Sequence, residues 1–338
     1  MKTTSIKNDA GFLALALRLV VGWTYFSAFW RRLFLADKLD PDTAGYIGEK
    51  FNHFLPHALG IKPMIEYLVT HPEALWWHMV IFTIIEGIVG LLIMFGFFTR
   101  LMSIGVFMLA LGILLGSGWI GTTCLDEWQI GILGIATGFL LFLSGGGKLS
   151  IDNYLIKKDF KITQKKSFQW LASGILPIKD QLFSKIVIVG SFLILGISLY
   201  TNQVFHGGLW GTLHNKSVKP HVEISNGKIE NDNLSFEVYR TEGVDVYGAW
   251  IISIELKNSN NETVLELSHN DFAISNTLTI DNYYVTKVKP GKHSLIIPLG
   301  AKAKLSIQDS KIKNLDNNIH TLKITDVSGA SWEHQVNN

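Results

Sequence analysis

Five long apolar runs constrain this chain more than any other feature of its sequence. A helix needs about 20 residues, at about 1.5 Å each, to cross about 30 Å of hydrocarbon. Because a bilayer core offers no partner to an exposed backbone group, helices are the structure expected for such runs. The sequence therefore predicts five membrane-spanning helices, at residues 11–30, 75–98, 101–120, 128–147 and 186–205.

Charge is unevenly distributed over the 338 residues. Charged residues make up 17% of the chain, against about 25% in an ordinary soluble domain, and nearly all of the deficit lies before residue 206. The net charge of +2, without a broad basic face, excludes a nucleic-acid binder. The single cysteine excludes a disulfide framework and a multi-thiolate metal cluster. No glycine-rich dinucleotide motif follows a strand and no cysteine cluster is present, so neither a flavin nor a bound metal is expected.

Lysine and arginine in the short loops predict the orientation in the membrane. With the N-terminus inside, the inner segments carry Lys2, Lys7, Arg100 and eight lysines between 148 and 185, which makes eleven, whereas the outer segments carry five. This bias predicts a cytoplasmic N-terminus. Since the number of spans is odd, the C-terminal domain is expected outside, which in a bacterium is the periplasmic side of the inner membrane.

The tail that follows the last apolar run has a different pattern. From residue 219 onward, alternating β-branched runs are broken by Asn226-Gly227, Pro290-Gly291 and other turn-like pairs. This pattern predicts an antiparallel β-sandwich, of which the immunoglobulin-like arrangement is one form. We expect it to be a binding or shielding module. The clearest strands are expected at 234–239, 250–256, 294–297, 304–307 and 321–325.

The predicted organisation is an all-α membrane bundle followed by an all-β domain. The long outer loop of the bundle contains four prolines and apolar residues at helical spacing, so we expect short helices that lie across its outer mouth. The expected regions are a four-helix membrane domain at 1–155 with its outer loop at 35–74, a basic cytoplasmic linker at 156–185, a fifth membrane helix at 186–205 and the β domain at 206–338.

Two charged residues lie inside predicted spans, where a charge costs about 2.5–3.5 kcal/mol. Arg18 lies about 10 Å, and Glu86 about 18 Å, from the inner ends of their helices. The difference is close to the reach of an arginine, so the sequence suggests an Arg18–Glu86 pair. Such a pair either fixes the helix register or serves proton or quinone handling.

Three basic residues, Arg31, Arg32 and Lys38, follow the first span on the outer side, against the topological preference. Guanidinium groups match anions with several oxygens, such as carboxylate, sulfonate or phosphate, which favours a substrate site for an anion. The alternative is that their side chains simply extend to the membrane interface.

Cys124 lies in a short polar loop between Trp119 and Trp128. Asp126 and Glu127 would raise the pKa of its thiol, and arginines folded next to it would lower that pKa. The sequence leaves both a reactive thiol and an inert one open.

The first 155 residues carry a set of glycines, arginines and acids on and between the apolar runs. They are Arg18, Gly22, Arg31, Arg32, Glu86, Gly90, the run Gly96–Arg100 (GFFTR) and the run Gly145–Asp152 (GGGKLSID). Together with the stretch 23–32 (WTYFSAFWRR), this pattern resembles the DoxD branch of the DoxX/DoxD superfamily of four-helix membrane proteins. The fifth run and the tail, with its motif at 243–251 (GVDVYGAWI), resemble DoxA. The whole chain thus resembles a fusion of the two subunits of the thiosulfate:quinone oxidoreductase family.

The resemblance implies a reaction in which two thiosulfates are joined to tetrathionate while a membrane quinone, of the ubiquinone or menaquinone type, accepts two electrons as a diffusible acceptor. We expect Cys124 to act as a covalent relay and Glu86 or His78 to supply protons. Arg31, Arg32 and Lys38 would bind thiosulfate. The quinone and proton pathway is assigned to Arg18, Trp23, His78, Trp119 and Trp128.

Two other functions compete with this one. A DoxX-like bundle with a sandwich tail could be a scaffold for partner complexes, without any quinone turnover. Alternatively, the quinone reductase could use another donor such as sulfide, sulfite or a small thiol. A transporter is disfavoured, because no inverted repeat or pair of broken helices is evident. The oligomeric state is left open, a homo-oligomer included.

Overall fold

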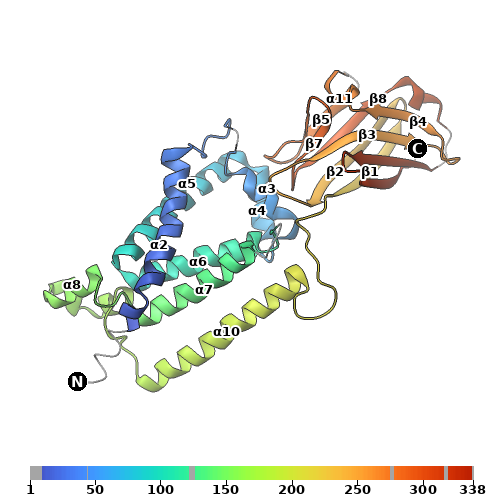
Figure 1. Cartoon of the computed structure of the whole chain (residues 1–338). Helices are drawn as coiled ribbons and strands as arrows, with labels where there is room; N and C mark the ends of the chain where they lie inside the picture. The colour runs from blue at the N-terminus through green and yellow to red at the C-terminus, as the bar shows by residue number, and fades with distance from the viewer. Residues whose placement is uncertain (1–9, 44, 122–125, 275–277, 316–318, 337–338) are drawn as a thin grey trace. The chain divides into compact units, whose positions relative to one another are not determined.

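The computed structural model describes residues 10–43, 45–121, 126–274, 278–315 and 319–336 (Figure 1). The chain folds into two compact units. The helical unit comprises residues 1–47, 76–118 and 123–214, and the β unit comprises residues 48–75, 119–122 and 215–338.

Among the residues that the structure describes, four helices are long and apolar enough to cross a membrane: α5 (Pro72–Phe95), α6 (Thr99–Ser117), α7 (Asp126–Ser144) and α10 (Asp180–His206). The first expected span corresponds to α2 (Leu15–Trp30), which has 16 residues and continues without a break into the π-helical segment η1 (Arg31–Leu35). The predicted fold class, an apolar helical part followed by an all-β part, is confirmed, and the protein is a membrane protein.

Small residues bring the helices of the helical unit close together. A Cβ added at Gly90 of α5 would lie 2.7 Å from the Gly22 carbonyl oxygen of α2, so these two backbones touch. On α7, Gly134 and Gly138 face Ala110 and Phe107 of α6 in the same way. In lipid, such close approach is what allows van der Waals packing to hold helices together.

The end of the helical unit that follows α7 is closed by α8 (Ile151–Lys157), the 3-10 turn η3 (Lys161–Gln164) and α9 (Lys166–Leu171). They lie in the segment for which a basic linker is expected. Phe168 and Ala172 are buried, and the backbone N–H of Arg100 donates to the Ala172 carbonyl oxygen at 3.2 Å. The first half of this segment therefore packs onto α6 as part of the helical unit.

The β unit contains two antiparallel sheets. One has the strand order β1-β2-β8-β5, and the other has the order β10-β9-β3-β7-β6 with β4 paired to β3. Each of the five clearest expected strands corresponds to an observed one. The bounds are β1 (His221–Glu230), β2 (Asn233–Glu242), β3 (Ala249–Lys257), β4 (Thr263–Ser268), β5 (Leu278–Asn282), β6 (Lys289–Pro290), β7 (Leu295–Ile297), β8 (Lys302–Gln308), β9 (His320–Asp326) and β10 (Ser331–Val336).

One expected turn is wrong. Asn226 and Gly227 lie inside β1, where the pairing with β2 shifts between Ser225 and Lys228. Asn226 has φ +52°, so the pair forms a bulge that bends the strand, because asparagine tolerates a left-handed backbone in a bulge as well as in a hairpin. Pro290-Gly291 does end β6, and the Gly291 N–H donates to the Ser294 carbonyl oxygen at 2.7 Å.

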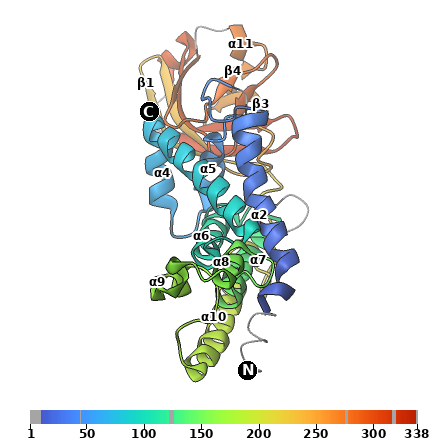
Figure 2. The same cartoon turned by 90° about the vertical axis from the view of Figure 1, so that its left-hand side faces the viewer.

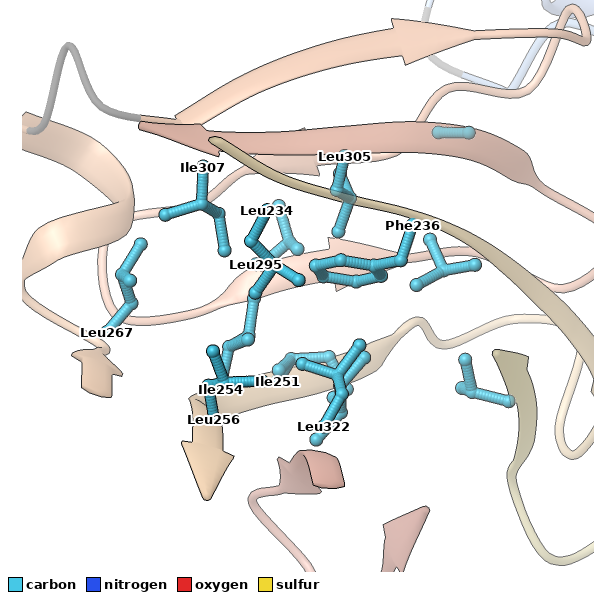
Figure 3. Packing of buried hydrophobic residues seen from close by; sticks show 14 of the residues in the cluster. Leu234, Phe236, Ile251, Ile254, Leu256, Leu267, Leu295, Leu305, Ile307 and Leu322 are labelled. Atoms are coloured by element: carbon cyan, nitrogen blue, oxygen red, sulfur yellow. The ribbon is translucent and has the colours of Figure 1, made fainter. Parts of the chain in front are cut away.

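The core of the sandwich is apolar and fully enclosed (Figure 3). Alternate residues of β2, such as Leu234, Phe236 and Val238, point inward and have no exposed surface. The same alternation on β8, beside β2 in its sheet, and on β3 and β9 of the other sheet completes the core. This is the burial pattern that the period-two sequence of the tail predicts.

The outer loop forms short helices, as expected: α3 (Glu49–Phe54), the 3-10 turn η2 (Leu55–His57) and α4 (Lys62–Thr70). These helices belong to the β unit rather than to the helical unit. The expectation that the short helices cover the mouth of the bundle stays a prediction.

Candidate functional site

A buried ion pair joins the segment after the C-terminal end of α2 to the middle of α5. The guanidinium Nη1 of Arg32 contacts Oε2 of Glu86 and lies 3.5 Å from the Thr83 hydroxyl. The guanidinium carbon also lies 5.8 Å from the centroid of the Phe82 ring. Glu86 is 3% exposed and Thr83 is fully buried. The pair therefore places one positive and one negative group on the apolar wall of α5.

The backbone explains how Arg32 reaches this carboxylate. Gly22 and Gly90 let α2 and α5 cross in contact, which fixes the two helices against each other. After Trp30 the helix widens to a π-helical turn that begins at Arg31. Such turns are uncommon and frequently occur at functional sites.

The suggested Arg18–Glu86 pair is wrong. The guanidinium of Arg18 instead donates to the carbonyl oxygens of Gly146 (2.6 Å) and Leu149 (2.5 Å), in the turn after α7. The last carbonyls of a helix and of the turn behind it lack intrahelical donors, so an arginine satisfies them well. The depth estimate from sequence cannot choose between this partner and Glu86, because an arginine side chain can extend toward either end of its helix.

The motif residues around the start of α6 and after α7 form a second buried polar cluster. Asp152 accepts hydrogen bonds from the backbone N–H groups of Phe98 and Thr99 (2.8 and 2.9 Å), and from the hydroxyls of Thr99 (2.7 Å) and Ser173 (2.8 Å). Asp152 thereby caps α6. Arg100 donates to three backbone carbonyl oxygens, those of Phe142, Gln169 and Gly174.

These contacts give the motifs at 96–100 and 145–152 a structural role. The residues that carry the family resemblance there close the end of the bundle, and the carboxylate of Asp152 has four donors. Ser173 was not singled out from the sequence, because nothing in a lone serine of a polar segment marks it as a partner of Asp152.

The two remaining basic candidates lie close to Arg32 in the chain. Arg31 is exposed, and its Nε donates to the Ser27 carbonyl oxygen at 3.3 Å. Lys38 is exposed as well, and its backbone N–H donates to the Arg32 carbonyl oxygen at 2.9 Å. The turn after η1 thus folds Lys38 back toward Arg32, so the structure keeps the three basic residues in one segment.

The residues of the expected quinone and proton pathway are dispersed. His78 is half-buried and its ring centroid lies 6.4 Å from that of Phe82, the ring that Arg32 also faces. Trp23 is 58% exposed on α2. Trp128 donates from Nε1 to the Thr201 hydroxyl of α10 at 2.9 Å, whereas Trp119 is buried in the β unit.

The single thiol lies outside the described residues, so the prediction of a reactive Cys124 stays a prediction. Gly121, three residues before it, belongs to the β unit, where its backbone N–H donates to the Ser217 hydroxyl at 2.9 Å.

A shallow apolar groove of about 290 Å³ runs between α7 and α10. Phe139 and Leu140 line it from α7, and Val187, Ser191 and Ile194 line it from α10. Its lining is suited to hydrocarbon rather than to a polar group.

A second set of charged residues, missed by reasoning from sequence, lies in the β unit. The Nζ of Lys50 on α3 is 2.6 Å from Oδ2 of Asp245, and the Nδ1 of His53 is 3.9 Å from the same oxygen. One turn further on, the Nε2 of His57 lies 3.8 Å from Oε1 of Glu242. Two histidines four residues apart share one helix face, and this spacing was the available signal.

Burial and charge set the protonation of this second set. Burial, and after it the positive charge of Lys50, lower the pKa of His53 to about 4, so this histidine is neutral near neutral pH. The pKa of Asp245 is lowered by its hydrogen bond and charge interaction with Lys50, which outweigh the opposing effect of burial. The contact therefore joins an ionised acid to a lysine, beside a neutral imidazole.

The fold and the buried pair define the class of this protein. It is a membrane protein in which a charged pair joins Arg32 of η1 to Glu86 of α5, and an antiparallel sandwich forms the C-terminal part. Residues 13–179 match the family described as TQO small subunit DoxD, and residues 205–335 match the family described as TQO small subunit DoxA. The chain belongs to the thiosulfate:quinone oxidoreductase family as a DoxD–DoxA fusion.

Proposed function

We propose that this protein oxidises two thiosulfates to tetrathionate and passes the two electrons to a membrane quinone. The observation that carries the proposal is the presence of both TQO small subunit families on one chain. The apolar helices give access to a quinone pool. The lysine and arginine bias supports a bacterial inner membrane setting, with the N-terminus in the cytoplasm and the β domain in the periplasm.

We assign Arg32 to anion binding and Glu86 to proton transfer. Arg31, Arg32 and Lys38 would attract the thiosulfate dianion. An anion that binds the guanidinium of Arg32 in place of Glu86 leaves the carboxylate of Glu86 buried without its partner. A buried carboxyl group without a partner is favoured in its neutral form. Substrate binding would thus be coupled to proton uptake by Glu86, which can then protonate the reduced quinone.

The sulfur chemistry would use Cys124 as a relay. The Cys124 thiolate and one thiosulfate join as Cys-S-S-sulfonate, and the two electrons released reduce the quinone, which takes up two protons. The second thiosulfate attacks the sulfur that carries the sulfonate, so tetrathionate leaves and the thiolate is restored. His78 is the second candidate for supplying protons to the quinone.

The apolar groove between α7 and α10 supports the quinone part of the proposal. A quinone carries a long hydrocarbon tail, and the groove offers hydrocarbon contact along both helices. Trp23 and Trp128 remain candidates for contact with the ring itself.

A direct assay tests the function. The purified full chain in detergent is given thiosulfate and a soluble quinone analogue, and quinone absorbance is followed while tetrathionate is measured. One tetrathionate formed per quinone reduced supports the proposal. Quinone reduction with sulfide or sulfite but not with thiosulfate would show that the protein uses another sulfur donor. No turnover with any of them would favour the function as a scaffold.

Cys124→Ser tests the relay. We expect this variant to lose thiosulfate-dependent quinone reduction while its unfolding midpoint stays close to that of the wild type. A rate near the wild-type value eliminates the covalent relay but leaves the overall reaction in place.

A further inference from the structure

The outer loop of the DoxD region and the DoxA region form one compact unit, although they match separate families. The contact is centred on Asn52 of α3, which has no exposed surface. Its Nδ2 donates to the Gly300 carbonyl oxygen at 3.2 Å, and its Oδ1 accepts from the Thr286 N–H at 3.2 Å. One amide side chain thus bonds two separate backbone segments of the sandwich.

Gly300 shows how closely the two surfaces fit. It has φ +71°, and a Cβ at this position would overlap the backbone of Asn52. Any side chain here would both strain the backbone and push α3 away. The position therefore requires glycine for two independent reasons.

Charge complementarity lies beside this contact. Lys50 pairs with Asp245 at 2.6 Å. Asp245 is part of the turn between β2 and β3, which the buried Arg240 holds by donating to the carbonyl oxygens of Val244 (2.9 Å) and Tyr247 (2.5 Å). The acid is thus presented on a rigid turn, which is what a specific ion-pair contact requires.

The second helix of the loop, α4 (labelled in Figure 2), adds apolar and backbone contacts. The Val285 N–H donates to the Val69 carbonyl oxygen at 3.1 Å, and the Tyr284 hydroxyl donates to Oε1 of Glu66 at 3.2 Å. Tyr284 also packs against the small apolar cluster that contains Ile65 and Val69. A buried amide, an ion pair and an apolar cluster in one place are the parts of a stable protein interface.

We propose that residues 48–75 are the docking element for the β-sandwich, and that this contact holds the two family regions together without the covalent link through α10. The partner that the element fits is a DoxA-type sandwich with a glycine at position 300 and an acid in the turn at 243–247. The proposal is independent of the chemistry suggested above.

The test uses the full chain. A protease site is inserted into the exposed stretch 208–213, the purified protein is cut to completion in detergent, and the N-terminal fragment is recovered by an N-terminal tag. We expect the C-terminal fragment to stay bound. Its loss from the wild-type protein on cutting would overturn the proposal.

Variants identify the surface. Lys50→Glu and Gly300→Ala should each release the C-terminal fragment about tenfold faster or more, and Lys50→Glu combined with Asp245→Lys should restore retention. Lys62→Glu is the matched control, because Lys62 is an exposed lysine on the same element. The uncut variants are first compared with the wild type by circular dichroism, and restored retention in the charge swap would show that Lys50→Glu acts through the ion pair with Asp245. If Lys50→Glu and Gly300→Ala both retain the fragment like the wild type, this surface is not the docking site.

Discussion

Arg32 reaches from the π-helical turn after α2 to the buried carboxylate of Glu86 on α5. The pair combines a candidate for anion binding with a candidate for proton transfer. Without its partner, the charge of either residue would be left uncompensated in largely apolar surroundings.

Glu86→Ala should therefore destabilise the protein. Removing one partner of a buried ion pair costs about 3–5 kcal/mol, and we expect the lower end because the Arg32 side chain is 17% exposed. The unfolding midpoint of the full chain in detergent measures the effect. Glu73→Ala, at an exposed carboxylate of the same helix, should change stability by less than about 1 kcal/mol.

Replacing both partners separates the structural cost from the functional one. The variant Arg32→Met with Glu86→Leu should recover most of the lost stability, because apolar side chains often replace a buried pair without penalty. It should not recover quinone reduction. A double variant as unstable as Glu86→Ala would contradict the pairing as the source of the cost.

Thiosulfate dependence tests the basic cluster. Loss of a charge-assisted hydrogen bond from Arg31→Ala or Arg32→Ala should raise the half-saturating thiosulfate concentration by about tenfold or more, with a smaller change for the quinone. Lys62→Ala provides a control at a basic residue elsewhere in the outer loop. Equal effects on thiosulfate and quinone would count against an anion site at Arg31 and Arg32.

The crossing of α2 and α5 predicts a sharp contrast between two glycines. In Gly90→Ala the new methyl would lie 2.7 Å from the Gly22 carbonyl oxygen, so we expect a loss of about 1–3 kcal/mol. In Gly112→Ala the methyl meets nothing within 4 Å, and the helix preference of alanine should make that variant neutral or slightly more stable. Unfolding midpoints in detergent compare them. Similar midpoints for both variants would mean that the two helices do not touch at Gly90.

His53 predicts an acid-sensitive β unit. Burial lowers its pKa to about 4 in the folded protein, against about 6.5 when unfolded. The unfolded state therefore binds more protons between these values, so stability falls as the pH falls from about 6.5 to about 4, by at most about 1.4 kcal/mol per pH unit.

The comparison with His53→Gln isolates this contribution. Unfolding followed by tryptophan fluorescence should show a shallower pH dependence for the variant in that window, since glutamine does not titrate. The same slope in both proteins would show that other groups cause the acid sensitivity.

The sequence by itself determined the layers of this protein. Runs of about 20 apolar residues leave only helices as an option in a bilayer, and the period-two alternation of residues such as Leu234 and Phe236 places every second side chain in a sandwich core. Both patterns are local, so they can be recognised without knowing what packs against them. The family resemblance rested on motifs that are contiguous in the chain, and it too is confirmed.

Only the tertiary structure decided the partners. By side-chain length alone, either Arg18 or Arg32 could reach Glu86. The crossing of α2 and α5 at Gly22 and Gly90 places Arg32, rather than Arg18, beside Glu86. Likewise, nothing local in the outer loop shows that Asn52 bonds Gly300, which is 248 residues away. The physical reason is that a long polar side chain can satisfy its hydrogen bonds with several alternative groups, and the packing of distant backbone segments selects among them.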